Sequence, residues 1–489
     1  MAWRRAFAVG GLFLLPCVVA LAGNAERAWS PQGAPPAAAA VADTSAVAKE
    51  AAGWLADLIR INTTNPPGNE LAAAKYVAGV LQKEGVSAEL LEVAPGRSAV
   101  VARLRSSAMA DPSRALLLVG HLDVVGVDRA KWTVDPFAAT EKNGFLYGRG
   151  AVDGKSMVAA NLAVFVALKR ANARLTRDLI FLATCDAERE GDAPDAGIKT
   201  LVAKYWDRFA AGYALNEGGD VVVKNGKAQY AAVQVIEKVE VNVGVVARGR
   251  SGQASQPGKD NALVHLAAAI ARIGGYTAPT RLTTVVRRYF EGLAKIEDDE
   301  IGKWMRALDT ADRGEHAVRV LSEASPAWNA MLRDTVTPTM ISAGILPSAI
   351  PSEARAVLNV RLVPGDSVDG LILDLTKLVN DPSVKIEAIP NSNIPAPPSA
   401  LDSELYQTIE KAAQEQFPGA AVLPLQGAGA TDSAQLRLHK VQAYGLRPFP
   451  LTEAETGTSH GDDERLPLAA FAQGVQFLYR IVSEFAVGR

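Results

Sequence analysis

The sequence predicts an α/β protein whose central sheet is covered by helices on both faces. Two observations carry this prediction: short apolar runs that suit buried strands, and segments of helical periodicity that alternate with them. The apolar runs lie at 99–104, 115–119 and 179–184, and the helical segments at 45–60, 70–84 and 157–170. Continuous apolar strands that alternate with helices are typical of a largely parallel sheet with both faces buried.

The pattern changes near residue 235. Residues 239–247 and 354–362 alternate apolar and polar side chains, as half-exposed strands do. Helices are expected at 262–273 and 368–379, and residues 280–340 are expected to be largely helical and irregular. These features predict an α+β unit with an antiparallel sheet that has one face in water. Helices and short strands return after about residue 395, so the smaller unit is inserted into the larger one.

With 489 residues, the chain is too long for one ordinary core. We divide it into a signal peptide, a flexible tether, the first part of the main domain, an inserted domain and the second part of the main domain. These parts are 1–22, 23–44, 45–234, 235–392 and 393–489.

The N-terminus has the features of an export signal. Arg4 and Arg5 precede an apolar run over residues 6–22, which ends in small residues suited to cleavage. An uncleaved membrane anchor is the alternative, although the run is short for a span. The expected location is therefore periplasmic or secreted.

Composition excludes several classes of protein. Hydrophobic residues make up 48% and charged residues 21% of the chain, as in a soluble globular protein. The formal net charge of −2 and the lack of a long basic run argue against a nucleic-acid partner. No segment after the signal is apolar enough to span a membrane. The chain has only five histidines, which limits the choice of metal ligands.

The sharpest local feature is a histidine at the end of a predicted strand. His121 follows the apolar run 115–119, and Asp123 lies two residues further on. Ligands gather beyond the carboxyl ends of strands in α/β sheets, and an acid can orient a neighbouring imidazole. The pattern indicates a metal ligand, but a turn histidine beside a solvated aspartate would look the same.

Four further loops add possible ligands. Asp153 follows a glycine-rich turn just before the helix 157–170, where it either caps the helix or bridges two cations. Glu188 and Glu217 follow apolar segments, and His460 opens a polar stretch near the C-terminus. With His121, the set offers two imidazoles and three carboxylates. It suits two divalent cations, with zinc preferred and manganese or cobalt as alternatives.

In their order and spacing, these motifs resemble the metallopeptidase family of aminoacylases, G-type glutamate carboxypeptidases, carnosinase-like dipeptidases and carboxypeptidase S. The resemblance covers nearly all of the chain after residue 45. It implies a zinc-exopeptidase (phosphorylase/hydrolase-like) catalytic domain with an inserted α+β lid or dimerisation domain. It also implies that His121 and Glu217 bind one ion and that Glu188 and His460 bind the other. Asp153 would bridge both ions, and Asp123 would orient His121.

The resemblance also implies substrate-binding residues. Arg361, in the predicted strand 354–362, matches a position that grips a substrate carboxylate, a task that suits an arginine fork. From the residues alone it could equally be a surface arginine. Thr431 and Asp432 match a loop that lines the carboxylate end of the substrate.

Two positions depart from the family pattern. Ala187 stands where a general-base glutamate is usual, and loss of such a base typically costs about 10²–10⁴ in rate. Glu190 is a candidate for a displaced base. Gln253 stands where a histidine usually stabilises the oxyanion, and its amide donates a hydrogen bond without a positive charge.

Two functions follow from these residues. The first is a metal-dependent exopeptidase or amidase that hydrolyses a dipeptide, a peptide C-terminus or an N-acyl amino acid. The second is a metal-bearing homologue without catalysis that acts as a binding protein, which Ala187 and Gln253 favour. A purely structural secreted protein would leave the five motifs as coincidence. Homodimerisation stays open.

Overall fold

The computed structural model describes residues 44–107, 111–188, 197–297, 299–390 and 393–488. Within these ranges, no helix combines the length and apolar character that a membrane crossing requires. The predicted signal peptide and all but Thr44 of the predicted tether lie outside the described residues, so both stay predictions.

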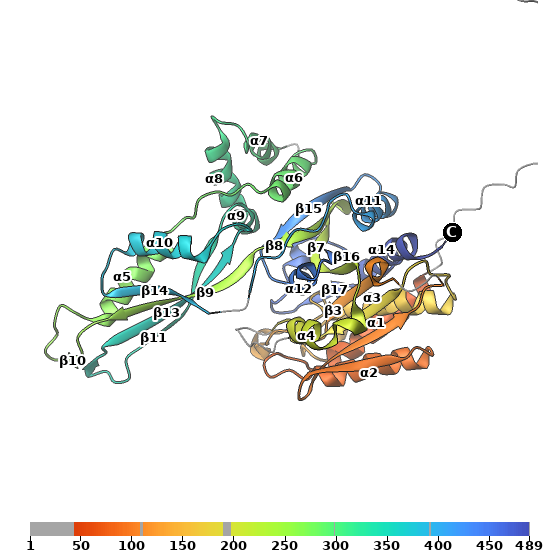
Figure 1. Cartoon of the computed structure of the whole chain (residues 1–489), viewed down its shortest axis with the longest axis horizontal. Helices are drawn as coiled ribbons and strands as arrows, with labels where there is room; N and C mark the ends of the chain where they lie inside the picture. Colours follow the sequence, from red (N-terminus) through yellow and green to blue (C-terminus); the bar gives the residue numbers. More distant parts are fainter. Residues whose placement is uncertain (1–43, 108–110, 189–196, 298, 391–392, 489) are drawn as a thin grey trace, which may run out of the picture. The chain divides into compact units, whose positions relative to one another are not determined.

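A mixed eight-stranded sheet forms the main layer, in the order β1-β2-β6-β3-β7-β16-β8-β15 (Figure 1). Strands β6, β3, β7 and β16 are parallel to one another, whereas β1, β2 and β6 pair antiparallel. In that order the strands span Ala88–Ala94, Arg97–Leu104, Leu179–Thr184, Leu116–His121, Tyr213–Lys224, Gln442–Leu451, Lys227–Glu237 and Ala421–Gly427. The parallel centre brings the carboxyl ends of β3 and β6 to one edge.

Helices cover both faces of this sheet. Alternate residues of β3 belong to two separate apolar clusters, with Leu116 and Leu118 in one and Leu117 and Val119 in the other. The first cluster packs against α1 (Ser45–Arg60), α2 (Glu70–Lys83), α3 (Lys155–Arg170), α11 (Glu404–Gln416) and α14 (Leu468–Ala486). The second packs against α4 (Gly197–Phe209) and α12 (Ser433–Leu438). The predicted fold class is confirmed.

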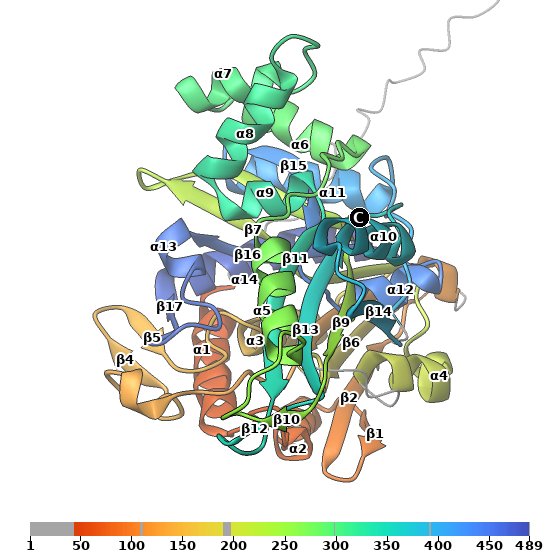
Figure 2. The ribbon, with the colours of Figure 1, turned by 90° about the vertical axis from the view of Figure 1, so that its left-hand side faces the viewer.

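A four-stranded antiparallel sheet, in the order β11-β13-β9-β14, forms a second layer. Its strands span Thr335–Ala343, Glu353–Leu362, Val239–Arg248 and Val384–Ile389, and its apolar cluster includes side chains of α5 (Ala262–Gly274) and α10 (Val368–Val379). Figure 2 shows these elements from a second side. The expectation of largely helical and irregular structure over 280–340 is wrong at its end, where β11 begins. This edge strand is exposed from Thr337 to Ala343, so its sequence lacks the alternation that marks a half-buried strand.

Four helices fill most of the segment before β11: α6 (Thr284–Leu293), α7 (Glu300–Ala307), α8 (Gly314–Ala324) and α9 (Pro326–Leu332). Their apolar cluster includes Leu423 of β15, so these helices pack against the edge of the main sheet that β15 forms. Smaller elements are β4 (Thr140–Lys142), β5 (Phe145–Tyr147), β10 (Gly252–Gln253), β12 (Ala349–Ile350), α13 (Glu453–Thr456) and β17 (Arg465–Pro467). The chain from Asp43 onward forms one compact unit, so the domain boundaries at 235 and 393 stay predictions.

Candidate metal centre

His121 is the last residue of β3, a strand in which all six residues are buried. Its Nδ1 is 2.9 Å from the backbone oxygen of Asp123, and its Nε2 is 3.2 Å from Asp153 Oδ1 and 3.3 Å from Glu217 Oε2. A Cβ at position 154 would collide with the His121 ring, so this close approach requires glycine. Buried β3 thus presents one fixed nitrogen to two carboxylates.

Asp153 lies between two groups of possible ligands. Its Oδ1 faces His121, and its Oδ2 is 3.3 Å from His460 Nε2. His460 is in turn 3.0 Å from Glu188 Oε1. Within each group, His121–Asp153–Glu217 and Asp153–Glu188–His460, the ligand atoms lie within 4.8 Å of one another. Asp153 belongs to both groups, so the structure brings together all five residues that the sequence predicted as ligands.

The donor set and its spacing fit two divalent ions. Zinc bonds of about 2.0–2.2 Å in tetrahedral geometry place neighbouring ligand atoms about 3.3 Å apart. The observed separations of 3.0–3.3 Å between each histidine nitrogen and its carboxylates match this value. Nitrogen and carboxylate oxygen also suit manganese and cobalt, so the residues do not select one ion.

The electrostatics of the two groups also favour cations. Burial alone would raise the pKa of Asp153, but hydrogen bonds from His121 and His460 hold it well below its usual range. Hydrogen bonds to Asp153 and Glu188 raise the pKa of His460 to about 10. Both imidazoles therefore face the ionised carboxylate of Asp153, and a bound ion would take the place of the imidazole protons.

Asp123 contacts His121 more closely through its backbone oxygen than through its carboxylate. The backbone oxygen of Asp123 is the closer partner of His121, since the carboxylate Oδ1 lies 3.6 Å from Nδ1. The carboxylate instead accepts hydrogen bonds from the backbone N–H groups of Ala187 and Glu188, at 3.1 and 2.8 Å, and from Asn65 Nδ2 at 2.8 Å. Asp123 thus ties the His121 loop to the turn that carries Glu188.

Ala187 lies in that turn, directly before Glu188. Its side chain has no ionisable group, so the position itself supplies no proton acceptor. Glu190, the candidate displaced base, lies outside the described residues.

Glu464 is fully buried and supports the loop before Asp153. Its carboxylate accepts hydrogen bonds from Arg149 Nη1 and from the backbone N–H groups of Gly150, Val152 and Asp153, at 2.7–3.0 Å. One carboxylate therefore fixes the backbone of residues 150–153, the loop that carries the bridging position.

Thr431 and Asp432 lie beside the end of β6. The backbone N–H and the hydroxyl of Thr431 both donate to Glu237. Asp432 Oδ2 accepts a 2.7 Å hydrogen bond from Thr184, which pairs in register with His121. Burial raises the pKa of Asp432 to about 7.

The other two predicted residues with described positions, Gln253 and Arg361, lie in two smaller sheets. Gln253 is exposed in β10 and pairs with Ala349 of β12. Arg361 in β13 donates to Asn359 Oδ1 at 3.1 Å and lies 3.3 Å from Glu240. The structure does not place either side chain in contact with the five predicted ligands, as far as the described residues extend.

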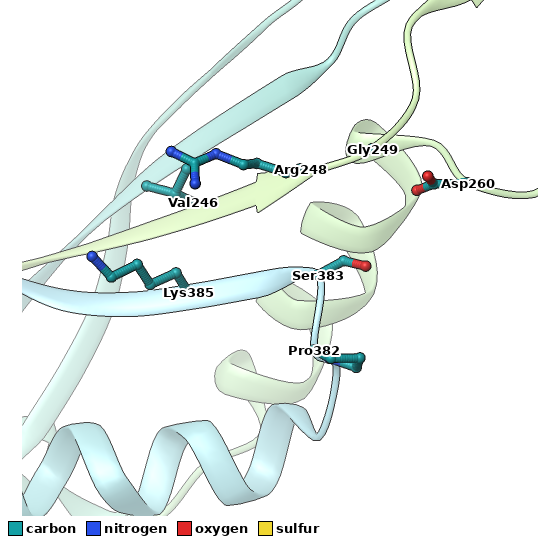
Figure 3. Close-up of a pocket in the computed structure, with 7 residues that line it drawn as sticks. All are labelled: Val246, Arg248, Gly249, Asp260, Pro382, Ser383 and Lys385. Atoms are coloured by element: carbon teal, nitrogen blue, oxygen red, sulfur yellow. The ribbon is translucent and has the colours of Figure 1, made fainter.

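A pocket of about 360 Å³ also lies in the second sheet, and none of the predicted site residues lines it (Figure 3). Its lining residues are Val246, Arg248, Gly249, Asp260, Pro382, Ser383 and Lys385.

Sequence reasoning missed four residues that contact the ligands or their supports. Ser459 Oγ donates to Asp153 Oδ2 at 2.8 Å, and Arg447 Nη1 lies 3.9 Å from the same oxygen. Asn65 Nδ2 donates to Asp123, and Glu464 accepts a hydrogen bond from the backbone N–H of Asp153. Glu464 and Ser459 flank His460 closely in sequence, and that proximity was a usable signal, whereas Arg447 lies in a strand with no local signature.

With this geometry established, comparison with known proteins decides the family. A family model described as Peptidase family M20/M25/M40 matches residues 117–484. The chain belongs to this family. The predicted resemblance is confirmed, and the homologues indicate a metallopeptidase or amidohydrolase enzyme.

Two relatives illustrate the range of the family. A probable carboxypeptidase S-like 2 from Dictyostelium discoideum is 27% identical over 378 residues, covering 76% of this chain and 71% of the relative. The human N-fatty-acyl-amino acid synthase/hydrolase PM20D1 is 27% identical over 386 residues, covering 76% and 74%. Among solved structures, the M20 metallo-carboxypeptidase Sso-CP2 from Sulfolobus solfataricus superposes with a TM-score of 0.64 at 18% identity, covering 89% of this chain and 99% of its own. This last likeness supports the fold.

Proposed function

We propose that the protein hydrolyses amide bonds of small acyl-amino acids or peptides with two divalent ions, zinc by preference, held by His121, Asp153, Glu188, Glu217 and His460. The observation that carries this proposal is the position of Asp153, whose two oxygens face the two groups of ligands separately. Such an arrangement suits a bridging carboxylate between two ions.

When bound, the two divalent ions would polarise the substrate carbonyl and lower the pKa of a bound water. The residues of the chain hold this geometry. Asp153 orients toward both histidines, while Asp123 and Glu464 fix the loops that present Glu188 and Asp153. The metal ligands are therefore already in place when the substrate binds, and such pre-organisation lowers the barrier to reaction.

The substrate proposal draws on the relatives and on Arg361. A carboxypeptidase S-like protein and an N-fatty-acyl-amino acid hydrolase are both named for substrates or products with a free carboxylate. Arg361 supplies a guanidinium, a group that suits such a carboxylate. Its present partners, Asn359 and Glu240, are partly exposed side chains of the same sheet. We therefore propose N-acyl amino acids and dipeptides as the substrate class.

The test is to load the purified protein with zinc and assay a panel of dipeptides and N-acyl amino acids. Amide hydrolysis that chelation abolishes and added zinc restores is the expected result. Full activity in protein freed of metal would overturn the proposal.

The second candidate is a metal-bearing binding protein without catalysis, which Ala187 favours. Comparison of the parent protein with an Ala187→Glu variant distinguishes the two functions. The variant adds a carboxylate directly before Glu188, whose own contacts with His460 and Asp123 stay in place. Turnover by the variant alone would establish the silent function. Turnover by the parent that Glu190→Gln removes would identify Glu190 as the displaced base.

We also propose that the protein is exported and cleaved after residue 22, on the strength of Arg4, Arg5 and the apolar run that follows. N-terminal sequencing of protein from a periplasmic or culture fraction tests this. A start near residue 23 is expected, and an intact N-terminus in membranes would favour the uncleaved anchor.

A further inference from the structure

Arg447 of β16 is held rigidly beside the candidate metal centre. It pairs in register with Asp220 of β7. Its Nε donates to Asp220 Oδ1 at 2.8 Å, and its Nη2 donates to Oδ2 at 3.1 Å. Two parallel charge-assisted hydrogen bonds fix the plane of the guanidinium. The third nitrogen, Nη1, therefore has a set direction.

That third nitrogen lies at the bridging carboxylate. Nη1 is 3.9 Å from Asp153 Oδ2, too far for a hydrogen bond, and Glu217 is close enough to interact with the guanidinium electrostatically. Nη1 donates no hydrogen bond to any described residue, and it is not fully buried. The Arg447 side chain is only 12% exposed, and this nitrogen keeps part of that exposed surface.

Two other buried arginines, one in the loop before α3 and one in α12, behave differently. Arg149 uses Nη1 for Glu464 and Nη2 for backbone oxygens, and Arg437 uses Nη1 for the backbone oxygen of Ala443 and Nη2 for Glu237. Both terminal nitrogens are engaged in these structural arginines. A terminal nitrogen left free at the edge of a candidate active site indicates a donor for a ligand.

Amide hydrolysis creates an anion that such a donor can stabilise. Water adds to the carbonyl carbon, and the C=O electron pair moves onto the oxygen. When this oxyanion re-forms the C=O bond, the C–N bond breaks and the amine leaves with a proton from the water. A fixed donor at the oxyanion costs no reorganisation during the reaction. Gln253, at the position of the usual histidine, offers only a neutral amide.

We propose that Arg447 is a catalytic residue whose Nη1 donates a hydrogen bond to the oxyanion of the tetrahedral state, with Asp220 as its positioning residue. This inference rests on the proposed amide hydrolysis. It assigns to the main sheet the positive charge that Gln253 lacks.

Binding of two inhibitors to the zinc-loaded protein, measured by calorimetry, tests the proposal without requiring turnover. One is a phosphinate analogue of an N-acyl amino acid, which carries the tetrahedral oxyanion. The other is the matched reduced amide, in which a CH₂ group replaces the carbonyl. Both keep the substrate's carboxylate.

We expect Arg447→Gln to weaken phosphinate binding about 10²-fold, in line with the loss of an oxyanion donor. Affinity for the reduced amide stays within about threefold of the parent, because this inhibitor carries no oxyanion. The zinc content per chain is unchanged. Arg447→Lys keeps the charge but not the fork, and Asp220→Asn frees the fork, so both give smaller losses of phosphinate affinity. Arg103→Gln is the matched control, because it removes an arginine–aspartate pair of similar burial, with Asp178, at the opposite end of β6.

Three results would overturn the proposal. Equal losses for both inhibitors would mean that Arg447 grips the substrate carboxylate. Loss of zinc would mean that it supports Asp153, and unchanged phosphinate binding would mean that it has no role. Failure of the parent protein to bind the phosphinate or to hydrolyse any amide would instead refute the proposed function on which the inference rests.

Discussion

The candidate metal centre and the second sheet differ in how completely their predicted residues are assembled. At the metal centre, five residues from five separate segments already lie at coordination spacing, and partly buried hydrogen bonds hold the loops of Asp153 and Glu188. In the second sheet, Arg361 contacts Asn359 and Glu240 of the same sheet, and Gln253 is exposed in the separate β10–β12 pair. The difference indicates that this fold pre-organises the candidate metal ligands, whereas the carboxylate binding proposed for Arg361 rests on one residue outside that cluster.

The largest expected effect comes from the bridging position. Asp153→Asn places an amide between His121 and His460, so we expect zinc affinity to fall by about 10²-fold or more and hydrolysis to be lost with it. Calorimetric titration of chelator-treated protein measures the affinity. The exposed Asp462, in the same loop as His460, supplies the control Asp462→Asn, which leaves affinity unchanged. Tight binding of two ions by Asp153→Asn would contradict a bridging role.

Removing a support tests how firmly the same region is held. Glu464→Gln breaks a fully buried ion pair with Arg149, and we expect the free energy of unfolding to fall by about 3–5 kcal/mol. Urea unfolding measures the change, with the exposed Glu453→Gln as control. A loss below about 1 kcal/mol, the value typical of a surface pair, would show that the loop does not depend on Glu464.

Arg361 tests the second side of the comparison. If it binds the substrate carboxylate, Arg361→Gln raises KM about 10-fold, equivalent to about 1.4 kcal/mol, while kcat and zinc content stay near those of the parent. Steady-state kinetics on an N-acyl amino acid measure this. Arg355→Gln, on the same strand, serves as control. A fall in kcat at constant KM would place Arg361 in the chemical step instead.

The smallest effect is a pH-dependent one within the second sheet and its helices. A 2.6 Å hydrogen bond to Asp381 raises the pKa of His265. A histidine whose pKa is raised on folding contributes its full stability below its ordinary pKa of about 6.5, and the contribution is lost as pH rises through the folded value. We expect His265→Gln to cost under about 1 kcal/mol at pH 6 and less at pH 9. Urea midpoints at the two pH values measure this, and a larger cost at pH 9 would refute the assignment.

The parts of the structure that the sequence predicted well are those whose signal is local. Apolar runs marked β3 and β6 because both faces of these strands are buried, and His121 ends the first run while Glu188 follows the second. The edge strand β11 was missed because its side chains are exposed from Thr337 to Ala343, so it shows no buried, apolar face. Arg447 was missed because its partner Asp220 is more than two hundred residues away, and only the pairing of β7 with β16 brings them together.

The central claim is that the chain holds two ions through a shared Asp153. The most direct test is the metal content of purified protein, stripped with chelator, reloaded with zinc and measured by mass spectrometry against protein concentration. Two zinc ions per chain, with both lost together in Asp153→Asn, is the predicted result. One ion or none in the reloaded parent protein would contradict the account.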